Sequence, residues 1–182
     1  MEPVAERYRR LADRMTELIA GVPDDRWASP TPCEAWTVRD LVAHVVEVHG
    51  MFQKLVGRSL VKHPAVEVDP LGAWTAVRDQ MQADLDDPDR AAEEYDGMMG
   101  RSTFGASVDG FVCFDLIVHG WDLARATGQD ESMDAADVEQ LQVMVDRMGP
   151  MMLENGVISR QLEPPADASP QERLLAGLGR QS

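Results

Sequence analysis

Near the start of the chain, apolar side chains recur at alternating intervals of four and three residues, which places them along one side of a helix. The side chains in this series are Val4, Tyr8, Leu11, Met15, Leu18 and Val22. We predict a first helix over about residues 3–21. Three prolines interrupt any regular pattern in residues 23–35, which we therefore interpret as a loop.

The second helix has the clearest start signal in the sequence. Thr37 is placed as the N-cap, and Asp40 follows three residues later as its partner in a capping box. A stripe with the same three-four spacing then follows and is predicted to face the core: Leu41, His44, Val48, Met51 and Leu55. His44 therefore takes a position that is otherwise apolar, whereas Glu47 and His49 lie off the stripe and are predicted to be solvated.

A third helix is predicted to begin at Asp69 and Pro70 and to stop at Asp87 and Pro88. Residues 91–107 contain three glycines without a period and are interpreted as a loop. A fourth helix is expected over about residues 107–127.

The fourth helix is apolar around much of its circumference, which indicates central burial, and Gly128 suits its C-cap. A fifth helix is predicted over about residues 135–153, with a kink near Pro150. A short final helix should begin at Ser169 and Pro170. No strand pattern competes, so we predict an all-α protein: one domain spanning residues 1–182, with four main antiparallel helices and an additional C-terminal helix.

Composition narrows the classes of function. The chain has 182 residues, 44% of them hydrophobic, and a formal net charge of -15. This acidity disfavours nucleic acids and anionic membranes as partners. The first residues lack the apolar core of a signal peptide, so a cytoplasmic protein is expected, with Cys33 and Cys113 as thiols.

Three polar residues share one face of the fourth helix. At about 100° per residue, Asp115 and His119 lie about 40° apart, and Asp122 lies about 20° to the other side of Asp115. Carboxylates directed into a protein interior need partners. A divalent cation bound by His44, Asp115 and His119 would satisfy them, because imidazole and carboxylate suit zinc and related metals.

Other interpretations of these residues stay open. Asp115 and His119 could form a buried hydrogen-bonded pair without a metal, and His44 alone could be a satisfied core histidine. Asp122 could orient a metal-bound histidine, act as the alternative carboxylate ligand, or shuttle a proton as a catalytic group. Cys33 precedes the second helix and is either an inert loop thiol or a thiol with a depressed pKa.

Two runs of sequence resemble a known family. The first extends from Thr31 to His44 and reads Thr-Pro-Cys-Glu-Ala-Trp-Thr-Val-Arg-Asp-Leu-Val-Ala-His. The second extends from Asp115 to Gly128 and reads Asp-Leu-Ile-Val-His-Gly-Trp-Asp-Leu-Ala-Arg-Ala-Thr-Gly. Both are similar to the DinB-like superfamily, and more narrowly to its branch related to the metal-binding domain of mycothiol-dependent maleylpyruvate isomerase. The ending from Ser169 to Arg180 resembles the same branch.

The resemblance implies a DinB-like four-helix bundle that holds a divalent metal ion, zinc or nickel, at the positions of His44, Asp115 and His119. The isomerase branch has glutamate where this chain has Asp115. The isomerase also has a further C-terminal domain, for which we expect no counterpart in this chain, so isomerase activity is not carried over. A homodimer is plausible by the same analogy.

Two functions follow as hypotheses. In the first, the protein is a metal-dependent transferase that presents a low-molecular-weight thiol, such as mycothiol, as the nucleophile toward an electrophilic substrate. In the second, it is a noncatalytic module that binds a metal or a small ligand. Metal-assisted hydrolysis and a metal-free bundle that acts through protein contacts are further alternatives.

Overall fold

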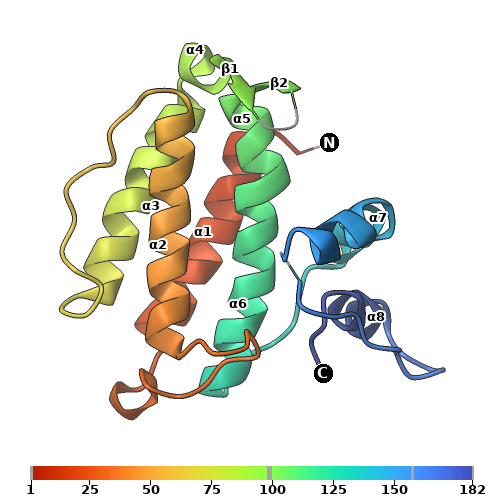
Figure 1. Ribbon diagram of the computed structural model, residues 1–182. Coiled ribbons are helices and arrows are strands. Elements are labelled where there is room, and N and C mark those ends of the chain that lie inside the picture. Colours follow the sequence, from red (N-terminus) through yellow and green to blue (C-terminus); the bar gives the residue numbers. More distant parts are fainter. Residues whose placement is uncertain (1, 98–99, 157, 182) are drawn as a thin grey trace. The chain divides into compact units, whose positions relative to one another are not determined.

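The computed structural model describes residues 2–97, 100–156 and 158–181 (Figure 1). It divides into two compact units, Met1–Asp130 and Glu131–Ser182. The first unit is a helical bundle with one small hairpin, and the second contains two helices and their connection. The predicted all-α class is confirmed, and the predicted single domain remains a prediction.

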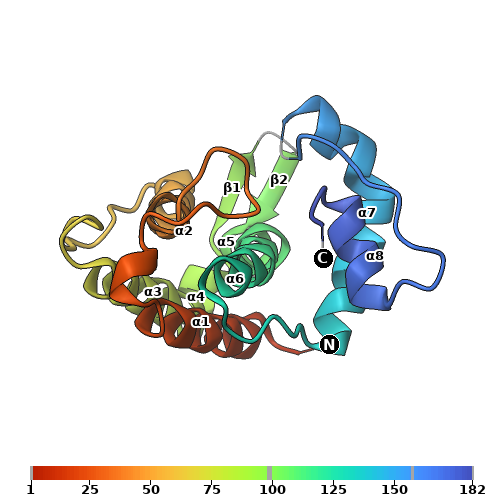
Figure 2. The same ribbon diagram turned by 90° about the horizontal axis from the view of Figure 1, so that it is seen from below.

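Four long helices form the bundle: α1 (Val4–Ala20), α2 (Val38–Leu55), α3 (Pro70–Asp86) and α6 (Cys113–Thr127). Helices α1 and α2 each pack against both α3 and α6, so the four helices form a closed ring. Figures 1 and 2 show them side by side from two directions.

The helix directions differ in part from the predicted antiparallel arrangement. Gln53 near the end of α2 donates to Asp84 near the end of α3, so these two neighbours run parallel. Figure 1 shows the reason: residues 56–69 return along the bundle before α3 begins. Helices α1 and α6 are also parallel, whereas α2 and α6 run in opposite directions (Figure 1).

Local end signals determine where several helices begin and stop. The Thr37 hydroxyl accepts the Asp40 N–H, and the Asp40 carboxylate accepts the Thr37 N–H in return, which confirms the predicted capping box. Asp69 caps α3 by accepting the Gly72 N–H. Gly128 adopts a left-handed φ of 73° after α6, a conformation that costs glycine little.

Residues 91–107 are not the irregular loop that was predicted. After the short helix α4 (Pro88–Ala91), strands β1 (Glu94–Gly97) and β2 (Gly100–Thr103) form an antiparallel hairpin. Each strand has only four residues, too few for a repeating pattern of apolar positions to be visible in the sequence.

The helix predicted over about residues 107–127 begins earlier than expected and is not uniform. It starts as α5 (Phe104–Ser107), with Thr103 as N-cap, and passes through a π-helical segment, η2 (Val108–Val112), before α6. π-Helical turns within α-helices are rare and are found often at functional sites.

Large apolar side chains from all four helices fill the centre of the bundle. The fully buried ones are Tyr8, Met15, Leu18, Ile19, Leu41, Trp74, Met81 and Leu123, together with Phe104 of α5. The connection between α1 and α2 contains the short 3-10 helix η1 (Asp24–Arg26) and crosses one end of the bundle. Most of the apolar series predicted for the first helix thus lies in the core.

The second unit contains α7 (Ala135–Glu154) and α8 (Pro170–Gly177), as predicted. These helices pack against each other through their own apolar side chains: Val138, Leu141, Val145, Leu174 and Leu175. Ser169 and Glu172 form a second capping box at the start of α8. Pro150 lies inside α7.

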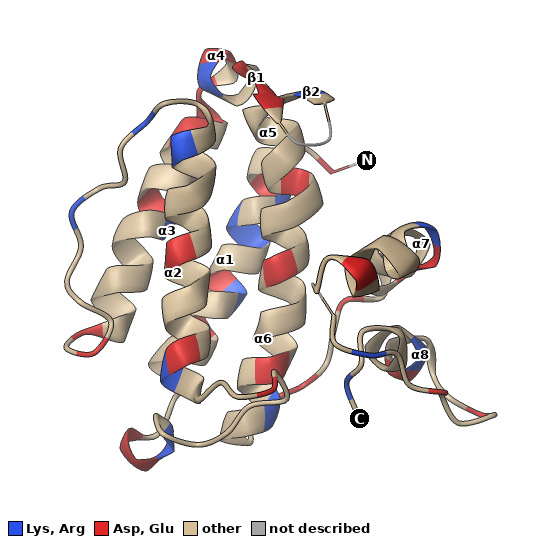
Figure 3. Cartoon of the chain, in the orientation of Figure 1, with Lys and Arg blue, Asp and Glu red and all other residues tan. Residues whose placement is uncertain are grey.

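Charged residues are spread over the helices and their connections. In the view of Figure 3, Lys and Arg segments are interspersed with acidic ones and do not form a continuous stripe. Among the described residues, no helix is both long enough and apolar enough to span a membrane.

Candidate metal centre

A cluster of polar side chains lies between α2 and α6, where these two helices face each other. His44 comes from the second turn of α2, whereas Asp115 and His119 come from consecutive turns of α6. The His44 Nε2 atom lies 3.4 Å from Asp115 Oδ1, and the His119 Nε2 atom lies 3.3 Å from the same oxygen. Residues that are distant in the sequence thus meet at one carboxylate.

The three side chains each direct one potential ligand atom toward a common point. Those atoms all lie within 4.8 Å of one another, a spacing at which they could hold one metal ion. Two imidazole nitrogens and one carboxylate oxygen are a donor set suited to zinc and related divalent metals. Of the residues named from the sequence, His44, Asp115 and His119 are therefore brought together.

Asp122 lies behind His119, on the side of the ring away from Asp115. Its Oδ2 atom is 3.0 Å from His119 Nδ1, and the residue is 0% exposed. A carboxylate at this position accepts the Nδ1 proton and leaves Nε2 directed toward Asp115. Of the roles that the sequence allowed for Asp122, this geometry favours the orientation of His119.

The electrostatics of Asp115 are dominated by its two histidine neighbours. Burial raises the pKa of this carboxyl, but hydrogen bonds from His119 and His44 outweigh burial and hold the pKa well below its usual range. Asp115 is consequently a carboxylate at neutral pH, which is the form that binds a cation.

His119 is shifted in the opposite direction. Burial lowers the pKa of its imidazole, yet hydrogen bonds to Asp115 and Asp122 outweigh burial and raise the pKa to about 9. Without a metal, this ring carries a proton at neutral pH and is neutralised by two carboxylates. A metal ion would replace that proton at Nε2, because imidazole binds metals in its neutral form.

The second oxygen of Asp115 indicates that the cluster is incomplete by itself. Asp115 Oδ2 is buried and accepts no hydrogen bond from any residue that the structure describes. A buried carboxylate oxygen without a partner is costly, and a bound cation would satisfy it. Both the donor set and this oxygen fit a divalent metal ion.

The indole ring of Trp36 packs beside the two histidine rings, a contact that the sequence did not indicate. Its ring centroid lies 4.6 Å from that of His44 and 5.7 Å from that of His119. The Thr31 N–H donates to the Trp36 carbonyl, and Ala35 takes a left-handed φ of 69° immediately before Trp36. This tight loop fixes the indole over the cluster.

The predicted environment of His49 was wrong. His49 is 1% exposed and lies in the bundle core, where its Nδ1 donates to the Val45 carbonyl and its Nε2 accepts from the Tyr8 hydroxyl at 2.8 Å. Its ring also packs edge-on against Trp74. The α2 face that packs into the core is thus centred near Val45 and His49 rather than on the predicted stripe.

The stripe continuing from His44 was also assigned to the wrong surface. Met51 and Leu55 are exposed and Val48 is half-buried, whereas the true core face is rotated around α2. The two faces have the same three-four periodicity, so the sequence spacing alone did not separate them.

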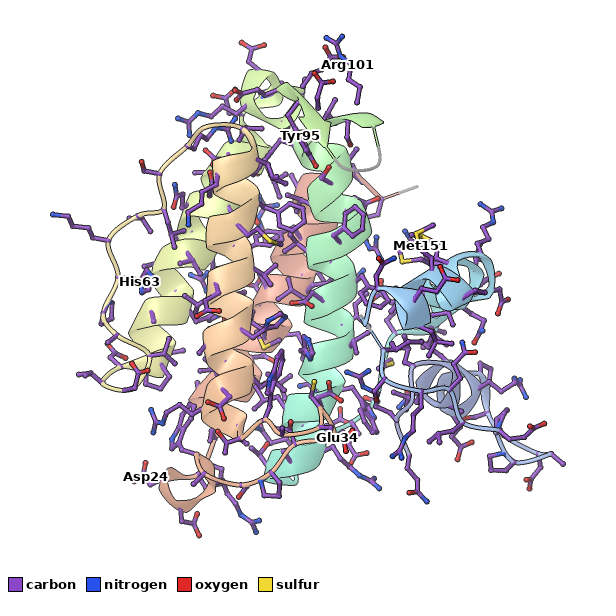
Figure 4. All side chains as sticks on the ribbon, viewed as in Figure 1. Asp24, Glu34, His63, Tyr95, Arg101 and Met151 are labelled. Atoms are coloured by element: carbon purple, nitrogen blue, oxygen red, sulfur yellow. The ribbon has the colours of Figure 1, made fainter. Side chains whose placement is uncertain are left out.

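The remaining candidates lie outside the cluster. Cys33 is half-buried in the loop before α2, and Cys113 is buried in α6. His63 lies on the connection between α2 and α3, as predicted, and Figure 4 labels it there.

The fold and the cluster define a class: a helical bundle with a histidine–aspartate–histidine site between two facing helices. Residues 8–124 match the family described as the mycothiol maleylpyruvate isomerase N-terminal domain. The chain belongs to this family, which confirms the resemblance found in its sequence. The matched region contains all of His44, Asp115, His119 and Asp122.

Relatives in Mycobacterium tuberculosis share the sequence to different extents. An uncharacterized protein of strain ATCC 25618 / H37Rv is 30% identical over 185 aligned positions, covering 99% of this chain and 98% of the relative. A second uncharacterized protein of the same strain is 36% identical over 44 positions, which cover 24% of this chain and 17% of that protein. No solved structure matches the chain.

Proposed function

We propose that the protein is a cytoplasmic, metal-dependent transferase that uses a low-molecular-weight thiol such as mycothiol as its nucleophile. One observation carries the proposal: His44, Asp115 and His119 direct three ligand atoms to within 4.8 Å of one another. The second Asp115 oxygen, which is buried and has no hydrogen-bond partner among the described residues, supports it. Membership of a family named for a mycothiol enzyme supports the choice of thiol.

Each residue of the cluster has a distinct task in this proposal. His44 and His119 would hold the metal ion through Nε2, and Asp115 would hold it through a carboxylate oxygen. Asp122 keeps His119 in the tautomer that frees Nε2. Trp36 packs on both imidazole rings and restricts the space beside them.

With a divalent ion held by His44, Asp115 and His119, a coordination position would stay open, and the ion would lower the pKa of a thiol bound there so that a thiolate would be available at neutral pH. In the transfer itself, the thiol loses its proton to solvent and its sulfur forms a new bond to an electrophilic carbon. The leaving group departs with the electron pair of the bond that breaks.

The first test measures metal content. Untagged wild-type protein is expected to contain about one divalent ion per chain, zinc or nickel, by elemental analysis. His119→Ala should lose this metal while circular dichroism shows a retained helical fold. His63→Ala is the matched control, since His63 is a loop histidine outside the cluster, and it should keep the metal. Metal-free wild-type protein would contradict the proposal.

The second test separates the transferase from a noncatalytic binding module. Mycothiol should bind to metal-loaded protein in calorimetry, and binding should disappear after complete chelation of the metal. With mycothiol and monochlorobimane, the metal-loaded protein should release chloride and form the thioether faster than the chelated protein. Thiol binding without any gain in rate would instead support the binding module.

A further inference from the structure

Beside the candidate metal centre lies a set of apolar side chains that the core does not use. It consists of Val48, Met51 and Leu55 from α2 and Phe111 from η2, and we call it the apolar stripe. Met51 is 53% exposed, Phe111 46% and Leu55 40%. Among the large apolar side chains that are exposed in the described part of the first unit, the others are Val61 and Val68 on the connection after α2.

The apolar stripe continues the line of the metal-ligand position along α2. On α2, Val48, Met51 and Leu55 follow His44 by four, seven and eleven residues, so all three point within about 40° of His44. On the facing side, Phe111 lies in η2, four residues before Asp115 in the helical run that continues into α6.

An aromatic contact places Phe111 of η2 against α2, close to the stripe. The Phe111 ring lies 6.2 Å from the ring of Phe52, which is the neighbour of Met51 on α2. Further along the boundary between the same two helices, His44 Nε2 lies 3.4 Å from Asp115 Oδ1. We call the boundary between α2 and the η2–α6 helix the seam. Because α2 and α6 run in opposite directions, the seam has ligand atoms at one end and apolar side chains at the other.

We propose that the apolar stripe binds the apolar part of the substrate, so that the electrophile is a molecule with a hydrophobic chain or ring next to its reactive carbon. This inference rests on the proposed metal centre and names the class of molecule that would react there. Exposed apolar patches of a few hundred Å² are often functional, and this one lies on a chain with a net charge of -15.

The size of the stripe favours a small molecule over a second copy of the chain. At roughly half exposure, its three large side chains present on the order of 300 Å². A stable protein interface usually buries about 800 Å² on each partner. Met51 also suits a binding surface, since the unbranched thioether side chain adapts to ligands of different shape.

The length of the stripe can be compared with that of a ligand. Seven residues separate His44 from Met51, which is about 10 Å along α2 at 1.5 Å per residue. An extended eight-carbon chain, at about 1.2 Å per bond, has a similar length. A molecule that binds the metal with one end can therefore reach Met51 with an eight-carbon tail.

Alkyl hydroxamates test this inference, because the hydroxamate group binds metals and the tail length can be varied. Calorimetry would compare acetohydroxamate, butano-, hexano- and octanohydroxamate on zinc-loaded full-length protein. Each added methylene should tighten binding about two- to fourfold until the tail passes Met51. In a Met51→Gln, Leu55→Gln double variant, acetohydroxamate should bind as in the wild type. The gain per methylene from hexano- to octanohydroxamate, whose last carbons reach Met51, should fall toward one.

A double variant of the connection after α2, Val61→Gln with Val68→Gln, is the matched control, since it removes the same number of exposed apolar side chains away from the seam. It should keep the wild-type dependence on tail length. An unchanged dependence in the stripe variant would overturn the inference but leave the metal centre intact. Failure of zinc-loaded wild-type protein to bind even acetohydroxamate would overturn both proposals.

A second copy of the chain is the competing occupant of the stripe. Sedimentation of wild type and of the stripe variant at the same concentration distinguishes the two. A wild-type dimer that becomes monomeric only in the stripe variant would assign this surface to self-association and overturn the inference. Equal sedimentation of the two proteins, with the tail-length effect above, supports the substrate surface.

Discussion

At the residue scale, we expect the hydrogen bond between Asp122 and His119 to strengthen metal binding. Replacing Asp122 by Asn keeps the size of the buried side chain but removes the charge that stabilises the Nδ1 proton. Loss of such an orienting partner typically weakens metal binding about 10- to 100-fold, and we expect at least about tenfold here. Competition with a chromophoric chelator measures this affinity.

The matched control for this variant is Asp24→Asn, which makes the same change of charge at an exposed position in η1, labelled in Figure 4. It should bind metal as the wild type does. Equal metal affinity in both variants would show that Asp122 does not act through His119.

His49 predicts a pH dependence of stability that is separate from the metal centre. Burial lowers the pKa of His49 to about 4, whereas an unfolded histidine titrates near about 6.5. Between these values the unfolded chain binds the proton and the folded chain does not. Stability is therefore fully present above about pH 6.5 and is lost as the pH falls toward about 4, by at most about 3 kcal/mol.

Urea unfolding of wild type and of His49→Gln at about pH 7 and about pH 4.5 measures this contribution. The wild type should lose more stability than the variant over this interval, because glutamine does not titrate. An identical loss in both proteins would mean that His49 already accepts a proton in the folded state. Only the difference between the two pH values is compared, so a general destabilisation of the variant does not matter.

Part of the candidate site could be predicted from the sequence, and part could not. His44, Asp115 and His119 could be named because two of them lie one turn apart on an apolar helix and the third stands in a recognisable run of sequence. The positions of Trp36 and His49 depended on packing. The loop before α2 places Trp36 against the histidines. Which side of α2 is buried depends on the helices that pack against it, and the spacing of apolar residues in α2 alone does not show this.

At the scale of the elements, removal of the N-cap of α2 should lower the stability of the protein by a measurable amount. Thr37→Ala removes the hydroxyl that accepts the Asp40 N–H, and loss of such an N-cap typically costs about 1 kcal/mol. For a chain of this size, the melting temperature should fall by about 2–4 °C. Thermal unfolding followed by circular dichroism measures the shift. Thr37→Ser keeps a hydroxyl and should melt close to the wild type, whereas an equal fall in both variants would argue against the cap.

Elements with local end signals were predictable, and elements defined by distant contacts were not. Thr37, Asp69 and Ser169 each cap a helix whose start was predicted, because a cap needs only neighbouring residues. The β1–β2 hairpin was missed because its strands have four residues each, and the π-helical turn of η2 has no sequence signature. The parallel course of α2 and α3 follows from the path of residues 56–69, which helical periodicity does not describe.

At the scale of the whole molecule, the candidate site belongs to one of two units. All three proposed ligands, together with Asp122 and Trp36, lie within Met1–Asp130. The second unit has its own apolar contacts between α7 and α8. The proposed metal chemistry is therefore separable in sequence from the C-terminal helices, and the sequence prediction of one domain is open to direct test.

A chain that stops after Asp130 provides this test. It retains every residue proposed to bind or orient the metal, so it should contain about one divalent ion per chain and bind it within about threefold of the full-length affinity. Elemental analysis and chelator competition measure both quantities, and circular dichroism establishes that the shortened chain is helical. A helical chain of residues 1–130 without metal would mean that the second unit supplies part of the centre, and the ligand set would then have to include a residue beyond Asp130.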